Sequence, residues 1–465
     1  FFTITEAAEI MGGEVRPLER GAEIMPQNLK ADSRSVSSGD AFIAIPGERT
    51  DGHRFIGDAV SRGASAVILE MEYYYRNAEE LDKLSAVMIP VSYTETAAAR
   101  LASRWLCVVS PRVVGITGSV GKTTTRELLY GVIHEYMRTH SAVKSYNTLI
   151  GCGMAILSMP ADTELLILEL GANRPGEIDE LVKNFPVTHG IITEVAESHL
   201  EGLKSIKGVL SAKMEITNSR TLQFLSYNND NEALSSAATS LDKRLRKASV
   251  GFGRSDVTVS DVRQSLGKDG SPNLSLSLSG YGEEIACETR FFGKQHAKNI
   301  AFAYAVARDL GLPGDMFAES VRRIGTPLGR GRICTTRLGL IIDETYNANP
   351  SSMSYALRNA LDIELDGDFR RVAILGGMRE LGDETERWHE VIMSRASLFD
   401  DVYLIGSEWD RVATKQGALK GRWRSVGDFA RDFDFASPSL DKSIILVKGS
   451  RFYSMEKLLP MLGVR

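Results

Sequence analysis

The segment from Val113 to Glu127, VVGITGSVGKTTTRE, constrains the fold more than any other part of the chain. The β-branched run RVVGIT predicts a buried strand, and a glycine-rich turn separates it from a helical pattern. The apolar positions with helical spacing are Leu128, Leu129, Val132, Ile133 and Tyr136. Strand, glycine turn and helix in this order predict a phosphate-binding loop. The strict pattern also asks for a glycine where this chain has Ile116, and Gly115 stands one place too early.

The physical requirements of such a loop are nevertheless met. Backbone N–H groups must point at a phosphate, so glycine is needed where a β-carbon would block the approach, and Gly118 and Gly121 stand at suitable points. Lys122 supplies a cation, and the Thr123 hydroxyl can bind Mg²⁺ at a helix start whose dipole favours anions. The residues predicted to bind the nucleotide here are Gly118, Ser119, Val120, Gly121, Lys122, Thr123 and Thr124. A tight turn with a surface lysine is the alternative interpretation.

Composition limits the classes of function. The net charge of -5 gives no basic field, so nucleic acid is not expected as a partner. No apolar run approaches the roughly 20 residues that span a bilayer, and the first residues do not resemble a signal peptide, so we expect a cytoplasmic protein without a membrane span. The four cysteines, at positions 107, 152, 287 and 334, lack zinc-site spacing and are expected to be reduced core thiols.

Length and patterning predict an α/β protein of three domains. Residues 1–90 combine short strands, turns and helices in one α/β module. Residues 91–313 hold the phosphate-binding loop and the strand-like runs LLILEL, HGIITEV and LQFLSYN between helical segments, which predicts a central parallel sheet with flanking helices. Within this region, residues 249–292 alternate at period two and predict a small antiparallel β insertion. Residues 314–465 have four further strand-like runs, typical of a Rossmann-like α/β domain.

Three residues of the central region could carry chemistry. Glu169 ends a predicted strand, where parallel sheets bind ligands, so its carboxylate could bind a metal or orient a water. A cap on the next helix or an ion pair with a lysine explains Glu169 equally well. His199 follows the next strand, and a lone histidine is more often structural. Lys213 alone has the pattern of a solvated helix lysine.

A denser cluster lies in the segment IIDETYNANPSSM. Asp343 ends a strand, Tyr346 and Asn347 occupy the following turn, and Asn349 before a proline forms a good helix N-cap. Capping explains Asn349 but not the carboxylate, aromatic ring and amide before it, which could contact a sugar and a base. Arg330, in PLGRGR, is a candidate contact for a phosphate or carboxylate.

Together these motifs resemble the Mur ligases of peptidoglycan synthesis. The resemblance rests on GITGSVGKTTT, ELGANRPGEI, SHLEGLKS with AKMEI, GKQHAKN, GRGR, DETYNANPSSM, LGGMRELG and VKGSR, in the right order over nearly the whole chain. The segment ADSRSVSSGDAFIAIPGERTDGHRFI is similar to the family's UDP-binding module. ELGANRPGEID and YNANPSSM are most similar to the members that add D-alanyl-D-alanine, and the DNP signature of members that add lysine or diaminopimelate is absent.

The resemblance implies a function for each predicted domain. Residues 1–90 would bind the UDP substrate, residues 91–313 would bind ATP, and residues 314–465 would hold the incoming amino substrate. ATP would phosphorylate the terminal carboxylate of UDP-N-acetylmuramoyl-tripeptide, and the amine of D-alanyl-D-alanine would attack the acyl phosphate. This reaction is the last cytoplasmic step in making the pentapeptide precursor, and the enzyme would be a monomer.

The resemblance also implies roles for single residues. The catalytic residues would be Lys122, Lys213 and His199. Lys213 stands at the position of the lysine that is N-carboxylated in the family. Two Mg²⁺ ions would be bound by Thr123, Glu169, His199 and Lys213. ATP would also contact Asn299 through adenine, Arg330 through the phosphates, Asp343 through the ribose, and Tyr346 and Asn347. The substrate-binding residues would be Ser33, Arg34, Asn147, Thr148 and Asn349.

Some positions depart from the family pattern. The usual Asn-x-Asn-Asn run is Ser145-Tyr146-Asn147-Thr148 here, and the usual LGDM is LGGM, with Gly377 in place of an acid. Arg332 could replace Arg330 as the relevant arginine. The alternatives are therefore a sister ligase that adds lysine or diaminopimelate, a folate-type polyglutamate ligase, or a P-loop protein that hydrolyses ATP and regulates a partner.

Overall fold

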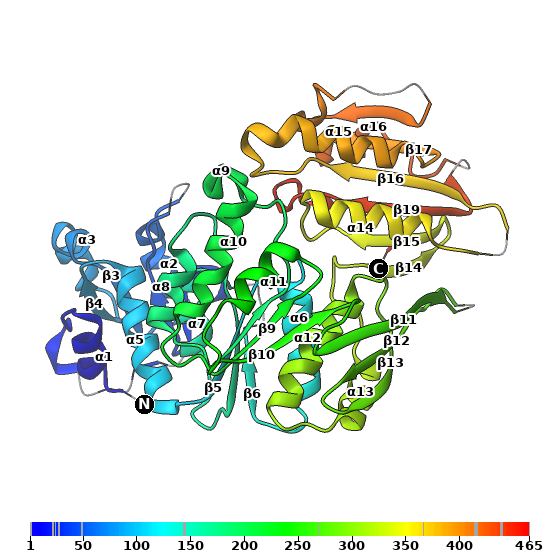
Figure 1. Cartoon of the computed structure of the whole chain (residues 1–465). Helices are drawn as coiled ribbons and strands as arrows, with labels where there is room; N and C mark the ends of the chain where they lie inside the picture. Colours follow the sequence, from blue (N-terminus) through cyan, green and yellow to red (C-terminus); the bar gives the residue numbers. More distant parts are fainter. Residues whose placement is uncertain are drawn as a thin grey trace.

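The computed structural model contains three β-sheets arranged along the chain (Figure 1). It describes residues 2–20, 23, 25–26, 28–47, 50–142, 146–267, 269–365, 367–412, 417–437 and 440–464. The sheets are mainly parallel and carry helices on their faces, so the predicted α/β class is confirmed.

The first sheet is parallel, with strand order β1-β2-β3-β4. Its strands are β1 (Leu29–Lys30), β2 (Ala41–Ile43), β3 (Ala66–Glu70) and β4 (Val87–Val91). The helices of this part are α1 (Ile4–Met11), α2 (Ile56–Ser61), α3 (Met71–Arg76) and α4 (Ala78–Leu81). Apolar clusters form on both faces of the sheet, because its strands are continuous apolar runs that are buried on both sides.

Helix α5 (Thr94–Val109) joins the first sheet to the second. Ala97 and Leu101 belong to the apolar core of the first sheet, whereas Ala102 and Trp105 belong to a core of the second. The helix thus contributes to two cores, and a domain boundary at residue 90 stays a prediction.

The second sheet has the strand order β13-β12-β11-β10-β9-β8-β5-β7-β6. Its strands are β5 (Arg112–Thr117), β6 (Thr139–Ser141), β7 (Leu165–Glu169), β8 (His189–Ile192), β9 (Phe224–Asn228), β10 (Arg246–Gly251), β11 (Val257–Leu266), β12 (Pro272–Gly280) and β13 (Glu283–Thr289). Strands β5 to β11 pair in parallel, and β11, β12 and β13 pair antiparallel. The antiparallel strands predicted within residues 249–292 are confirmed, and they extend the edge of the parallel sheet.

Helices cover both faces of this sheet (Figure 1). They are α6 (Lys122–Ile133), α7 (Leu149–Leu157), α8 (Glu177–Asn184), α9 (Leu200–Leu203), α10 (Ile206–Met214), α11 (Glu232–Thr239), α12 (His296–Asp309) and α13 (Gly314–Arg323). Tyr136, predicted on the first of them, lies beyond its end at Ile133. Phe317 and Val321 of α13 pack in a core of the second sheet, although residue 314 was predicted to begin the third domain; that boundary stays a prediction.

The third sheet has the order β14-β15-β19-β16-β17-β18, with β14 antiparallel to β15 and the other neighbours parallel. Its strands are β14 (Arg332–Thr336), β15 (Gly339–Glu344), β16 (Arg370–Gly376), β17 (Asp401–Ile405), β18 (Leu419–Trp423) and β19 (Ser443–Lys448). Its helices are α14 (Pro350–Leu361), α15 (Thr385–Ala396) and α16 (Val426–Asp432). Apolar cores on both faces confirm the predicted Rossmann-like layering.

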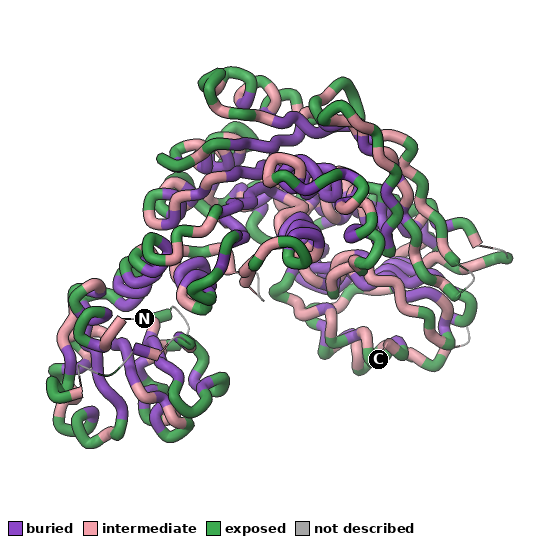
Figure 2. Tube along the Cα trace, turned by 90° about the horizontal axis from the view of Figure 1, so that it is seen from below, coloured by how far each residue is buried: buried purple, intermediate pink, exposed green. Residues whose placement is uncertain are grey.

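Buried residues follow the strands and the helices packed on them, while turns and outer helix faces are exposed (Figure 2). Cys152 and Cys287 are buried thiols, as predicted. Cys107 is exposed and Cys334 is half-buried, so the prediction of a core position is wrong for these two. Within the described part of the chain, every helix is too short or too polar to cross a membrane.

Candidate active site

A cavity of about 1080 Å³ lies between the second and third sheets. Its lining residues come from the ends of β7, β15 and β19, from the segments that follow β5, β6, β8, β15, β16, β17 and β19, from the segment before β14 and from the start of α12. Because the carboxyl ends of parallel strands are where such sheets bind ligands, the position of the cavity identifies it as the candidate active site.

The predicted phosphate-binding loop forms one wall of this cavity. Gly118 has φ +143°, and a β-carbon there would overlap Thr193 Oγ1 and lie 3.0 Å from the backbone nitrogen of Glu194. Gly121, at the N-cap of α6, has φ +93°. Both positions therefore require glycine. Ile116, where the strict pattern asks for glycine, is buried inside β5 and takes no part in the turn.

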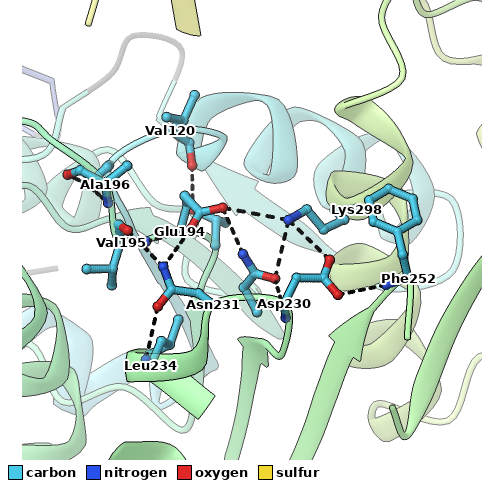
Figure 3. A network of polar contacts seen from close by, with 12 residues as sticks. Val120, Glu194, Val195, Ala196, Asp230, Asn231, Leu234, Phe252 and Lys298 are labelled. Atoms are coloured by element: carbon cyan, nitrogen blue, oxygen red, sulfur yellow. Dashed lines mark hydrogen bonds and ion pairs between the residues drawn. The ribbon is translucent and has the colours of Figure 1, made fainter. Parts of the chain in front are cut away.

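A second layer of polar contacts supports the loop from behind (Figure 3). Glu194, in the segment after β8, accepts a 2.9 Å hydrogen bond from the Ser119 backbone N–H through its own carbonyl. Its carboxylate accepts a 3.0 Å hydrogen bond from Asn231 Nδ2 and lies 3.6 Å from Lys298 Nζ. Lys298 also lies 3.4 Å from Asp230. The segments that follow β8 and β9 are thus linked to the loop and to α12, and these links restrict movement of the loop.

Lys122 lies at the start of α6 and lines the cavity. Its ammonium group donates a hydrogen bond to the Gly118 carbonyl, which holds it over the loop. Burial lowers the pKa of Lys122 to about 8; the negative charge of Glu169 opposes this shift and the positive charge of Arg330 adds to it. The side chain is predominantly a cation at neutral pH, as binding of a polyphosphate requires.

Glu169, Thr123 and Arg126 form a buried cluster beside Lys122. The Thr123 hydroxyl donates a 3.0 Å hydrogen bond to Glu169 Oε2, and Arg126 Nη1 lies 3.3 Å from Glu169 Oε1. Glu169 and Arg126 are each only 2% exposed. Glu169 therefore forms an ion pair, but with Arg126 and not with a lysine as the alternative interpretation expects. Arg126 escaped prediction, although its place three residues after Thr123 on one helix is a signal that could have found it.

The same cluster fits a magnesium ion. Carboxylate and hydroxyl oxygens are ligands that Mg²⁺ accepts, and the ion usually completes its shell with water and substrate phosphates. Glu169 Oε1 makes no hydrogen bond, although Arg126 Nη1 lies 3.3 Å from it, so a magnesium ion would share this oxygen with Arg126. Among the described residues, no three His, Cys, Asp or Glu side chains converge as a metal site.

His199 lies at the N-cap of α9, with φ +51°, and lines the cavity. Its Nδ1 is 2.6 Å from Glu380 Oε2, on the segment that follows β16. The backbone N–H of Glu201 donates a 3.2 Å hydrogen bond to the Glu380 carbonyl. His199 therefore links the second sheet to the third; a role in metal binding stays a prediction.

Lys213 lies in α10 and is only 1% exposed, so the interpretation as a solvated lysine is wrong. The structure records no hydrogen bond or ion pair of its ammonium group with another described residue. Burial, with a further contribution from the charge of Lys122, lowers the pKa of Lys213 to about 7. Much of the side chain is then a neutral amine at neutral pH, which is the nucleophilic form.

Asn299 is buried in α12 directly behind the loop. A β-carbon on Gly121 would lie 2.7 Å from Asn299 Oδ1, and Asn299 Nδ2 is 3.2 Å from His296 Nδ1. Burial, to which the charge of Arg330 adds, lowers the pKa of His296 to about 4, so its imidazole is neutral. Both side chains line the cavity. The predicted contact of Asn299 with adenine stays a prediction, and His296 was missed.

Arg330 reaches the loop from the segment before β14. Its Nη2 donates a 2.8 Å hydrogen bond to Thr123 Oγ1, and its guanidinium carbon lies 4.0 Å from the centre of the Tyr346 ring. Arg330 and Tyr346 both line the cavity, whereas Arg332 lies on β14 and does not. The geometry therefore favours Arg330 over Arg332 as the phosphate contact.

Asp343 is buried at the end of β15 but does not line the cavity. Its Oδ2 accepts a 3.1 Å hydrogen bond from the Gly329 N–H, and its Oδ1 accepts a 2.6 Å hydrogen bond from the Thr345 hydroxyl. These contacts hold the turn that carries Arg330. The predicted contact with a ribose stays a prediction.

Two residues of the segment after β15 and one at the end of β19 also line the cavity. Asn349 caps α14 and also donates a 3.2 Å hydrogen bond from Nδ2 to the Ser119 carbonyl. Asn347 is exposed, and its carbonyl accepts a 3.0 Å hydrogen bond from Lys448 Nζ. Lys448, at the end of β19, also lies 3.0 Å from Glu344 and was missed, although VKGSR marks the end of a predicted strand.

The proposed uridine residues lie away from this cavity. Ser33 is buried in a short 3₁₀ helix (Ser33–Ser35) beside the first sheet. The Arg34 side chain is exposed and pairs with Asp32 at 2.8 Å. The structure does not bring Ser33 or Arg34 to the phosphate-binding loop.

Of the proposed acceptor residues, Asn147 lines the cavity and Thr148 does not. The Gly171 N–H donates a 2.9 Å hydrogen bond to the Asn147 carbonyl, and a β-carbon on Gly171 would lie 2.8 Å from the Asn147 side chain. Thr148 caps α7. The departure at Ser145 lies outside the described residues.

Comparisons with known proteins agree with this architecture. Residues 27–106 match the Mur ligase family catalytic domain, residues 116–307 the Mur ligase middle domain, and residues 329–451 the Mur ligase, glutamate ligase domain. A UDP-N-acetylmuramoyl-tripeptide–D-alanyl-D-alanine ligase from Bacillus subtilis is 29% identical over 471 residues, covering 98% of this chain and 97% of that protein. The ligase of the same name from Synechocystis is 30% identical over 409 residues, covering 87% and 85%.

A solved structure also matches along most of the chain. It is the MurF ligase from Thermotoga maritima in complex with ADP, which has a TM-score of 0.78 and 27% sequence identity. The match covers 93% of this chain and 96% of that one.

Proposed function

The chain belongs to the Mur ligase family, and from this premise we propose that it is an ATP-dependent ligase that joins D-alanyl-D-alanine to UDP-N-acetylmuramoyl-tripeptide. The observation that carries the proposal is the cavity, which has a phosphate-binding loop on one wall and the strand ends of the third sheet on the other. Full-length similarity to ligases of this name supports the substrates, and ADP in the Thermotoga enzyme supports the use of ATP.

The proposed reaction has two steps. A terminal carboxylate oxygen of the tripeptide attacks the γ-phosphorus of ATP, and ADP leaves. The dipeptide amine then attacks the acyl carbon and loses a proton, and phosphate leaves with the oxygen that came from the carboxylate. The first step needs fixed cations because it brings negative charges together. Lys122 and Arg330 can supply them, because both donate hydrogen bonds to residues of the phosphate-binding loop and of the helix start that follows it.

We further propose that Thr123 and Glu169 hold magnesium, which would neutralise phosphate charge during the first step. His199 and Lys213 would serve a second ion. An N-carboxylated Lys213, formed when its neutral amine adds to CO₂ and releases a proton, would turn a cation into an anion suited to this task. The buried position of Lys213 and its lowered pKa support this proposal.

The acceptor would extend from the cavity toward the first sheet. Ser33 and Arg34 would bind its uridine nucleotide, while Asn147, Thr148 and Asn349 would contact its remaining parts. We also propose a cytoplasmic location and a monomeric working form, as the family resemblance implies.

The experiment that tests this proposal is release of phosphate from ATP by the purified chain with Mg²⁺ and UDP-N-acetylmuramoyl-tripeptide. We expect release only when D-alanyl-D-alanine is added, together with a pentapeptide product identified by mass. Release supported only by lysine or diaminopimelate, tested with the dipeptide acceptor, would assign the chain to a sister ligase. ATP hydrolysis that needs no amine would instead support a regulatory P-loop protein.

A further inference from the structure

The wall of the cavity opposite the phosphate-binding loop carries a fixed arginine. Arg379 follows β16, and its Nη1 donates a 2.7 Å hydrogen bond to Glu408 Oε1. The guanidinium carbon lies 4.5 Å from the centre of the Phe452 ring. Tyr453 donates a hydrogen bond to the other oxygen of Glu408. Arg379, Glu408 and Phe452 all line the cavity.

Gly377 makes this arrangement possible. A β-carbon on Gly377 would overlap Glu408 Oε2 and lie 3.0 Å from Glu408 Cδ. The family pattern has an acid at this position, and here the space beside the Gly377 backbone is filled by the carboxylate of Glu408, which arrives from the segment after β17. An acidic group is therefore retained at this point of the wall, although it comes from a different strand end.

The hydrogen bonds around Glu408 favour the ionised form of its carboxyl group. Burial raises the pKa of Glu408, but the hydrogen bonds from Tyr453 and Arg379 outweigh this effect and leave the pKa below its usual value. The Glu408 side chain is only 9% exposed, whereas that of Arg379 is 47% exposed. The Arg379 guanidinium interacts with Glu408 through Nη1 and also with the Tyr453 hydroxyl, and its five N–H donors are more than these two contacts use.

The other cations on this wall are engaged differently. Lys448 is buried between Glu344 and the Asn347 carbonyl. Arg451 pairs with Glu456 at 3.2 Å. Arg379 is held by Glu408 and by the ring of Phe452 and is exposed to the cavity, and its planar fork suits a carboxylate.

We propose that Arg379 binds the free carboxylate of the incoming amine substrate, and that Glu408 and Tyr453 position it. This inference rests on the proposed function, because D-alanyl-D-alanine has such a carboxylate at the end opposite its reacting amine. Phe452 fixes the plane of the guanidinium group from one side. Arg379 would then make the ligase select amines that end in a carboxylate.

The first experiment compares D-alanyl-D-alanine with its C-terminal amide as amine substrates. We expect the unmodified enzyme to prefer the free acid, and we expect Arg379→Ala to raise KM for the acid by about 10- to 100-fold, the range for a lost charge-assisted hydrogen bond. KM for the amide and for ATP should change by less than about twofold, because a neutral terminus and the nucleotide gain nothing from this arginine.

Arg387→Ala is the matched control. Arg387 also pairs with a glutamate, Glu384, and lies 5.3 Å from the ring centre of Trp388, but it does not line the cavity. We expect this variant to keep the preference for the free acid. If Arg379→Ala keeps that preference as well, the inference is overturned while the proposed function stands. If the unmodified enzyme uses neither amine, the proposed function fails, and the inference fails with it.

A second experiment tests the position of Glu408. Gly377→Asp alone should impair the enzyme because the new side chain meets Glu408. Glu408→Ala alone should raise KM for the dipeptide, and the double variant Gly377→Asp with Glu408→Ala should recover most of this loss, since it returns an acid to the same space. The double variant Gly377→Ala with Glu408→Ala should not recover. Equal KM values for the two double variants would contradict the positioning role.

Discussion

The two walls of the cavity are built in different ways. The nucleotide wall is made by one short segment, in which Gly118 and Gly121 shape the backbone and Lys122 follows directly. The opposite wall is made by side chains from separate strand ends, with Arg379 after β16 and Glu408 after β17. The first therefore depends on its backbone shape, whereas the second depends on contacts between side chains and distant backbone, such as that of Glu408 beside Gly377.

The largest effect is expected at the nucleotide wall. Lys122→Ala should lower kcat by roughly 10³-fold, because a fixed cation beside the transferred phosphate is lost. The fold should be unchanged, since Lys122 makes its hydrogen bond within the loop itself. Steady-state kinetics with circular dichroism would check this. If Lys122→Ala has activity close to that of the unmodified enzyme, the phosphate-binding loop is not the nucleotide site.

A glycine substitution tests the role of the backbone. Gly118→Ala should lower nucleotide affinity by roughly 100-fold, because positive φ and overlap with Thr193 both force the loop to move. Gly176→Ala is the control: Gly176 has φ +89° but nothing lies within 4 Å of the added carbon. Calorimetric titration with ATP should separate the two variants. Equal ATP affinities of the two variants would show that nucleotide binding does not depend on the backbone conformation at Gly118.

The two arginines in GRGR should differ in their effect. Arg330→Ala should raise KM for ATP by about tenfold, because a charged hydrogen bond beside Thr123 and the stacking on Tyr346 are both lost. Arg332→Ala should leave this KM nearly unchanged, since Arg332 does not line the cavity. The reverse result would move the phosphate contact to Arg332.

A last prediction concerns stability and pH and does not involve catalysis. The pKa of Lys213 is lowered to about 7 in the folded chain from an ordinary value of 10.5, so folding disfavours its cation. Stability should therefore be lowest below pH 7 and should rise as the pH increases toward 10.5, by up to about 1.4 kcal/mol per pH unit.

Lys213→Met should remove this rise. Urea unfolding in CO₂-free buffer at several pH values would measure it, and Lys207→Met, on the exposed side of the same helix, provides the control. If the unmodified chain and Lys213→Met show the same pH dependence, the buried amine does not titrate as described.

Local patterns were enough to predict much of the fold. The run RVVGIT is β5 over Arg112–Thr117, and LLILEL and HGIITEV contain β7 and β8. The middle of each of these strands is a continuous apolar run because it is buried on both faces. The predicted end of α6 lies too far along the chain, because Tyr136 is beyond the helix. The Tyr136 hydroxyl instead forms a 3.0 Å hydrogen bond with the Ser320 hydroxyl.

Local patterns alone indicate most clearly the part of the site that one segment makes. Lys122 and Thr123 were found because their spacing is local. Lys213 looked solvated because its burial depends on elements packed around α10, which no local pattern records. Glu408 and Arg379 were missed for a related reason: they are 29 positions apart and meet only after two strands pair.

The most direct test of the central claim follows one oxygen atom. The acceptor tripeptide would be labelled with ¹⁸O in its terminal carboxylate, and the phosphate released with ATP and D-alanyl-D-alanine would be analysed by mass spectrometry. Passage through an acyl phosphate predicts one ¹⁸O atom in each phosphate formed. Phosphate without the label would mean that water attacks ATP, and the two walls of the cavity would then not cooperate in amide formation.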